Sequence, residues 1–150
     1  AGKKTTGAAR KTRRAGKRRY TLKERLAEIS PKAMPRLMSK FKAAKVAWPP
    51  DEVALVAIKD SKVVELHARS QAGNWTFIHR YPVLAASGKV GPKLRRGDRQ
   101  VPEGIYRITY LNPNSQYHVS LRVNYPNAFD RKKARKEGRK DRGGDNMIHG

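Results

Sequence analysis

The sequence contains no cysteine among its 150 residues. This absence excludes a disulfide framework, a thiolate metal site and a thiol nucleophile within these residues. Acidic residues are scarce, with 12 Asp and Glu against 35 Lys and Arg, so the formal net charge is +23. No apolar run approaches the roughly 18 residues that cross a bilayer, and no apolar core of a signal peptide is present. The first residue is Ala, so the N-terminus neither shows nor excludes export.

A positive charge of this size attracts polyanions such as nucleic acid, anionic lipid headgroups or acidic envelope polymers, without selecting among them. Residues 1–19 hold nine Lys and Arg, no acid and no large apolar side chain. Such a segment buries too little surface to offset its ordering entropy, so we expect a disordered basic arm. The arm is either a tether to anionic polymers or lipid, or a solvated tail. A second basic run, residues 131–142, is predicted to be a surface loop.

Two short helices are predicted after the arm. The stretch 21–24 has the spacing of a capping box, followed by apolar residues at helical intervals. Ser30-Pro31 is expected to end this helix. Pro35 is expected to begin a second helix, which ends at residues 48–50.

From residue 52 the apolar pattern changes to that of strands. The continuous apolar run 53–58 predicts a strand covered on both faces, paired as a hairpin with residues 63–68. Alternation from 117 to 123 predicts a half-buried strand. Further strands are expected at residues 75–80, 83–86, 104–111 and 146–148. The predicted β-rich α+β fold is built from hairpins and divides into an arm at 1–19, a short helical segment at 20–50 and a domain at 51–150.

The four histidines are the first candidates for chemistry. His67, His79 and His118 lie inside strand patterns, and none belongs to an HExxH-like pair, so no metal site is predicted. His149 follows a short apolar run and precedes Gly150. A histidine at a strand end beside a glycine is exposed and well held, which suits a general base. Spacing alone favours an ordinary structural histidine.

A glycine- and arginine-rich loop is the second candidate. It contains Lys93, Arg95, Arg96 and Arg99, but it lacks the lysine-hydroxyl ending of a P-loop. The loop is either a rim that binds carboxylate or phosphate groups or a turn with solvated charges.

Short motifs follow one another in a set order along the second half of the chain. In sequence they are Ser87-Gly88, Gly91-Pro92-Lys93, Gly97-Asp98-Arg99, Pro102-Glu103-Gly104-Ile105-Tyr106, Asn124-Tyr125-Pro126-Asn127-Ala128 and Met147-Ile148-His149-Gly150. Together they resemble the catalytic domain of the L,D-transpeptidases, the YkuD domain, and within it the YafK-like branch. The resemblance covers about residues 52–150. It departs from many relatives at Val101, where they carry Thr or Ser.

The resemblance implies a β-sandwich fold and a cysteine acyltransferase that acts on peptidoglycan stem peptides in the periplasm or cell wall, without a metal or organic cofactor. It gives His149 the role of base and the Gly150 carbonyl the role of orienting the imidazole. Candidate substrate-binding residues are Lys93, Arg95, Arg99 and Tyr125. In the family a Ser-x-Gly-Cys motif follows the histidine and glycine. We therefore expect that the sequence stops before its cysteine, that this chain is inactive, and that its parent is an enzyme.

Other functions remain open on the sequence. An L,D-carboxypeptidase or endopeptidase would use the same scaffold, because water and an amine compete for the same thioester. A non-catalytic wall-binding domain would lack the nucleophile altogether. A basic nucleic-acid-binding module would explain the charge, but no RNP-like string places aromatic among basic residues, so no specific nucleic acid is expected.

Overall fold

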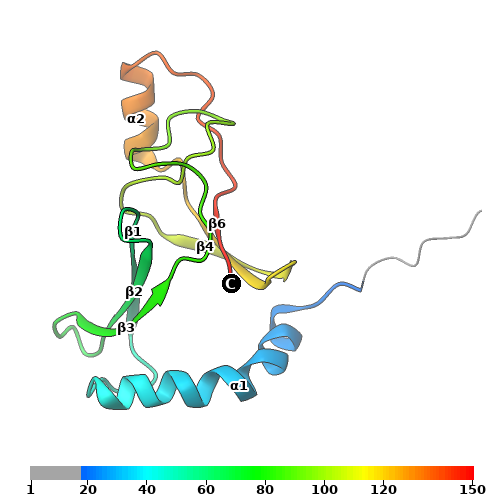
Figure 1. The fold of residues 1–150 in the computed structure, drawn as a ribbon, viewed down its shortest axis with the longest axis vertical. Helices are drawn as coiled ribbons and strands as arrows, with labels where there is room; N and C mark the ends of the chain where they lie inside the picture. The colour runs from blue at the N-terminus through cyan, green and yellow to red at the C-terminus, as the bar shows by residue number, and fades with distance from the viewer. Residues whose placement is uncertain (1–17) are drawn as a thin grey trace, which may run out of the picture.

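The computed structural model describes residues 18–150 (Figure 1). It is a small β-rich α+β fold with two helices and two three-stranded antiparallel sheets, ordered β1-β2-β3 and β4-β5-β6, which confirms the predicted class. The elements are α1 (Leu22–Ala43), β1 (Glu52–Ile58), β2 (Val63–Arg69), β3 (Thr76–Pro82), β4 (Ile108–Ser115), β5 (His118–Val123), α2 (Ala128–Lys136) and β6 (Met147–Ile148). Between residues 18 and 150 neither helix combines the length and apolar character needed to cross a bilayer. The predicted disordered arm lies almost wholly outside the described residues.

Helix α1 is one continuous helix, so the prediction of two short helices is wrong. It begins with the predicted capping box, in which the Thr21 hydroxyl accepts from the Glu24 N–H at 3.2 Å and the Glu24 carboxylate accepts from the Thr21 N–H at 2.8 Å. Pro31 and Pro35 lie inside the helix, although each lacks an N–H for the preceding turn. The helix continues through both because it packs on the core through Phe41, which is 1% exposed, and through the partly buried Leu37, and this burial offsets the lost hydrogen bonds.

The first sheet contains the predicted hairpin. Strand β1 pairs with β2 from Glu52↔Arg69 to Ile58↔Val63, and β3 adds to the other side of β2. Phe41 of α1 packs with Ala68 and Ile78 of this sheet to form the core. Strand β1 is not covered on both faces as predicted. It is an edge strand that leaves Val53 and Val56 exposed, because α1 contacts the sheet through β3.

The second sheet is built on the β4–β5 hairpin. Strand β4 begins at Ile108, later than predicted, and β5 matches the predicted alternating strand. Ser120 is one of the polar residues of that alternating pattern, yet its side chain is buried, with 3% of the residue exposed. The short strand β6 forms as predicted and pairs with β5 through Leu121↔Ile148. The strand predicted at residues 83–86 does not form, since pairing ends after β3 and the chain enters a long loop.

Helix α2 occupies part of the second basic run, for which the sequence predicts a surface loop. Asn127 caps it: its side chain accepts from the Asp130 N–H at 3.0 Å, and the Asp130 carboxylate accepts from the Asn127 N–H at 2.9 Å. Ala134 is fully buried against the body of the protein. The loop prediction is wrong because a reciprocal cap and one small buried residue stabilise a helix despite the high charge.

Helix α1 contacts β3 of the first sheet and β4 of the second, so the segment 20–50 packs on the domain that follows it. The sandwich arrangement of the sheets and the boundaries at residues 19 and 50 stay predictions.

Candidate active site

The glycine- and arginine-rich loop folds around the carboxylate of Asp98. Its Oδ1 accepts from Lys93 Nζ at 2.6 Å and from the Gln100 N–H at 3.1 Å, and its Oδ2 accepts from the N–H groups of Leu94 and Arg95 at 2.8 and 2.9 Å. Burial alone would raise the pKa of Asp98, but these hydrogen bonds outweigh it and hold the pKa well below its ordinary value. Asp98 therefore fixes the glycine- and arginine-rich loop as a turn.

Tyr125 joins this loop to the end of the chain. Its ring is 6% exposed, and its hydroxyl lies 3.1 Å from the carbonyl oxygens of both Lys93 and Arg142. A hydroxyl has one proton, so it donates to one of these carbonyls at a time. Burial, followed by the charge of Asp130, raises the pKa of Tyr125. We call residues 88–106 together with Tyr125 the loop cluster. The side chains of Tyr125 and Lys93 form hydrogen bonds within this cluster, and their predicted substrate-binding role stays a prediction.

A second tyrosine, Tyr106, connects the same cluster to the start of α2. Tyr106 packs edge-on against Tyr125, with ring centroids 5.9 Å apart, and its hydroxyl donates to Asp130 at 3.2 Å. Burial, followed by the charge of Asp130, raises the pKa of Tyr106. The Pro102–Tyr106 motif is therefore tied to the cap of α2.

The turn before Tyr106 is held by an ion pair. Lys59 at the end of β1 lies 2.9 Å from the Glu103 carboxylate and donates to the carbonyls of Gly91 and Val101 at 2.6 and 3.1 Å. The Lys59 hydrogen bond and then the Gly91 N–H lower the pKa of Glu103. Val101 contributes its backbone carbonyl here, so the departure from Thr or Ser leaves this contact intact.

His149 lies at the end of β6, next to the tip of the β4–β5 hairpin. The imidazole is exposed and stacks on the ring of Tyr117, with centroids 4.2 Å apart and planes inclined by 10°. Its Nδ1 lies 3.2 Å from the carbonyl oxygen of Gly150. A proton on Nδ1 is within reach of this oxygen and would leave Nε2 free to accept another proton.

The candidate residues fall into two groups. Lys93, Arg95 and Tyr125 lie together in the loop cluster, with Arg95 and Arg99 exposed. A side chain added at Gly143 would lie 3.2 Å from Lys93 Cε. From there the last segment, residues 143–150, runs away from α2 to the C-terminus (Figure 1). The loop cluster therefore lies at the start of this segment, near Gly143, and the His149 imidazole lies at its end.

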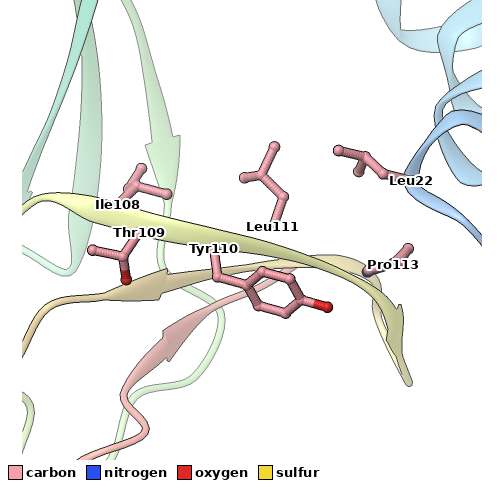
Figure 2. A pocket seen from close by; sticks show the side chains of 6 residues that line it. All are labelled: Leu22, Ile108, Thr109, Tyr110, Leu111 and Pro113. Carbon is pink, nitrogen blue, oxygen red and sulfur yellow. The ribbon is translucent and has the colours of Figure 1, made fainter.

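A groove lies between α1 and β4 (Figure 2). It has a volume of about 540 Å³ and is open to solvent. Figure 2 shows one lining residue from α1, Leu22, and the others from β4: Ile108, Thr109, Tyr110, Leu111 and Pro113. None of the candidate site residues lines it. In the described part of the chain, no three His, Asp or Glu side chains gather as a metal site would require.

Sequence reasoning missed the residues that hold these candidates in place. The sequence indicates Asp98 only as part of the Gly97-Asp98-Arg99 motif, although Asp in a turn commonly accepts nearby backbone N–H groups. Tyr117 belongs to a predicted strand, and no local pattern indicates that it stacks on a residue 32 positions later.

Relatives with significant similarity include two proteins described as putative L,D-transpeptidase YafK, one from Escherichia coli strain K12 and one from Escherichia coli O157:H7. Each is 31% identical over 81 residues, which is 53% of this chain and 32% of the relative. The chain thus spans about a third of the length of the curated relatives it matches. No family model matches the chain, and no solved structure matches it significantly. The similarity supports a relationship to the L,D-transpeptidases over about half of the chain.

Proposed function

We propose that this chain is part of a peptidoglycan L,D-transpeptidase of the YafK-like branch, in which His149 is the base for a cysteine nucleophile. The observation that carries the proposal is the exposed imidazole, held between the Tyr117 ring and the Gly150 carbonyl. The partial similarity to the Escherichia coli proteins gives independent support. The cysteine has no position among the 150 residues, so we assign it to residues that follow Gly150 in the parent protein.

The proposed chemistry follows from the two imidazole nitrogens. With Nδ1 donating to Gly150, Nε2 accepts the thiol proton, and the thiolate attacks the carbonyl carbon of a stem-peptide amide. The amide C–N bond breaks, the leaving amine takes the proton from Nε2, and a thioester remains. An acceptor amine then attacks the thioester, gives its proton to the imidazole, and forms the new amide as the thiol is restored. A free thiol has a pKa of about 8.5, so the neighbouring imidazole raises the reactive fraction at neutral pH.

The substrate-binding role also remains part of the proposal. Arg95 and Arg99 are exposed on the loop cluster and can pair with carboxylate groups. Because the last segment separates this cluster from the imidazole, we assign these arginines to a distant part of an extended wall polymer, not to the amide that breaks. Such a substrate places the parent protein in the periplasm or cell wall.

The test begins with the residues that the parent encodes after Gly150. We expect a cysteine within a short distance, and we expect the parent to convert purified muropeptides. Changing His149→Ala should reduce this turnover by about 10²–10⁴-fold, whereas His67→Gln, on the other sheet, should leave it unchanged. A parent without a nearby cysteine, or one equally active without His149, would contradict the proposal.

Product analysis separates transfer from hydrolysis. Crosslinked muropeptides support transferase activity, and trimmed stem peptides identify the L,D-carboxypeptidase or endopeptidase alternative. The 150-residue chain alone, which has no thiol, is expected to yield neither product.

A further inference from the structure

One face of α2 is both basic and exposed. Phe129, Lys132, Lys133 and Lys136 are spaced by three or four residues, so they share one side of the helix. We call these four residues the α2 basic face. Ala134, on a different side, is fully buried, and Asp130 is turned toward Tyr106. The α2 basic face therefore points away from the body of the protein.

Nearby acids do not neutralise this face. Asp130 caps the helix and accepts from Tyr106, Glu137 lies 2.6 Å from Arg139, and Asp141 lies 3.0 Å from Arg96. Within residues 18–150, the three lysines of the face have no acidic partner within 4 Å. Their charge is available to an external anion.

Two large exposed apolar residues lie at the start of α2, the helix that carries these lysines. Phe129 is 70% exposed in the first turn of α2, and Ile105 is 94% exposed. The carbonyl of Ile105 accepts from the Asn127 side chain at 3.0 Å, which places Ile105 at the start of the same helix. Exposed Phe and Ile next to lysines are typical of surfaces that bind the membrane interface.

We propose that the α2 basic face docks on the anionic phospholipid headgroups of a membrane surface, with Phe129 and Ile105 inserted into the acyl boundary. The lysines match the headgroup charge, as they would match any polyanion. The aliphatic side chain of Ile105 favours lipid over nucleic acid, because it gains free energy in an apolar phase and has no ring to stack on a base. The surface lies outside the proposed catalytic residues and does not depend on the proposed function.

The experiment measures co-sedimentation of the full 150-residue chain with vesicles. Vesicles of phosphatidylcholine alone are compared with vesicles of equal parts phosphatidylcholine and phosphatidylglycerol. The test variant combines Lys132→Gln, Lys133→Gln and Lys136→Gln. The matched control combines Lys23→Gln, Lys32→Gln and Lys42→Gln, which removes the same charge from exposed positions of α1. Gln and Lys have similar helix propensities, so both helices are retained.

We expect binding only to the anionic vesicles, weakened roughly ten- to a hundred-fold in the α2 variant and much less in the α1 control. Both chains keep residues 1–19, so the contribution of the basic arm cancels in this comparison. Equal weakening in the two variants would show non-specific charge attraction and would overturn the proposal.

A Phe129→Ser variant separates a membrane from a polyanion. We expect it to weaken binding to the anionic vesicles while its binding to double-stranded DNA stays unchanged. Unchanged vesicle binding would refute insertion. An equal loss of vesicle and DNA binding would identify the α2 basic face as a polyanion site instead of a membrane-docking surface.

Discussion

Replacing Asp98 by Asn removes one negative charge from the centre of the loop cluster at almost constant volume. The carboxylate accepts four hydrogen bonds, from Lys93 Nζ and from the backbone N–H groups of Leu94, Arg95 and Gln100. An Asn side chain has one acceptor oxygen, so its NH₂ group must face either Lys93 with Gln100 or the other two N–H groups. Either orientation places donors against donors.

The expected cost follows from this mismatch and from burial. The side chains of Lys93 and Asp98 are only 8% and 12% exposed, so water replaces the lost hydrogen bonds poorly. Removing one partner of a buried ion pair costs about 3–5 kcal/mol. Because both groups keep some contact with solvent, we expect Asp98→Asn to lower the free energy of unfolding by about 2–4 kcal/mol at neutral pH.

The stabilisation that Asp98 provides should depend on pH. The pKa of Asp98 is lower in the folded protein than its ordinary value, so its contribution to stability is complete above about pH 4. The contribution is lost as the pH falls from there through the lower pKa of the folded state. The difference in stability between the wild-type chain and Asp98→Asn should therefore be constant near neutral pH and shrink in acid.

Urea unfolding followed by circular dichroism measures both quantities. Asp60→Asn is the matched control, because Asp60 is exposed in the β1–β2 turn and accepts only from the Ser61 N–H and hydroxyl. We expect the control to change the free energy of unfolding by less than about 1 kcal/mol. An Asp98→Asn effect no larger than the control, or a difference that stays constant in acid, would refute the reasoning.

Three further substitutions test other parts of the structure. Phe41→Ala should lower the free energy of unfolding by about 3–5 kcal/mol in the same assay, because it empties the centre of the core. Gly88→Ala should destabilise the loop cluster by about 1–3 kcal/mol, since φ is +91° and the new Cβ would lie 2.6 Å from the Arg99 carbonyl; unchanged stability would contradict this close approach. Tyr117→Leu should remove the ring-current shift of the His149 ring protons in the NMR spectrum, because the stacked ring is lost.

Local sequence patterns predicted the elements whose stability is local. The capping box at Thr21 and Glu24, the β1–β2 hairpin and the short strand before His149 all form where the patterns place them. In each case the residues that stabilise the element are neighbours in sequence or lie on the adjoining strand. For these elements, the sequence pattern is therefore enough to predict where each one forms.

The errors occur where tertiary contacts or a competing signal decide. Pro31 and Pro35 predict helix ends, and only the burial of Phe41 reveals why α1 continues past them. In α2 the density of Lys and Arg outweighed a signal that was present, since Asn127 and Asp130 have the spacing of a capping box. The net charge of a segment indicates which ligands it attracts, but it does not determine whether the backbone is a helix or a loop.

For the candidate site, the order of the motifs indicated which loops matter but not how they meet. The sequence predicts that Lys93 and Tyr125 contact substrate, and this stays a prediction; the contacts of their side chains with Asp98 and with backbone carbonyls come from the structure alone. The sequence around a basic residue in a glycine-rich turn looks the same whether its side chain binds a ligand or stabilises the turn. The acid that accepts from Lys93 lies five residues further along the chain, and its position beside the amine depends on the fold of the loop.

The scarcity of acids has a consequence for the proposed chemistry. All 12 acidic residues fall within the described part of the chain, and each contacts a cation, a backbone N–H or a hydroxyl group. Asp98 and Glu103 have lowered pKa values and remain ionised at neutral pH. A group that exchanges a proton near neutral pH needs a pKa close to that pH, which these carboxylates lack. The proposed function therefore assigns proton transfer to an imidazole and not to these two carboxylates. Among the histidines of residues 18–150, His149 combines exposure with a backbone carbonyl oxygen 3.2 Å from its Nδ1.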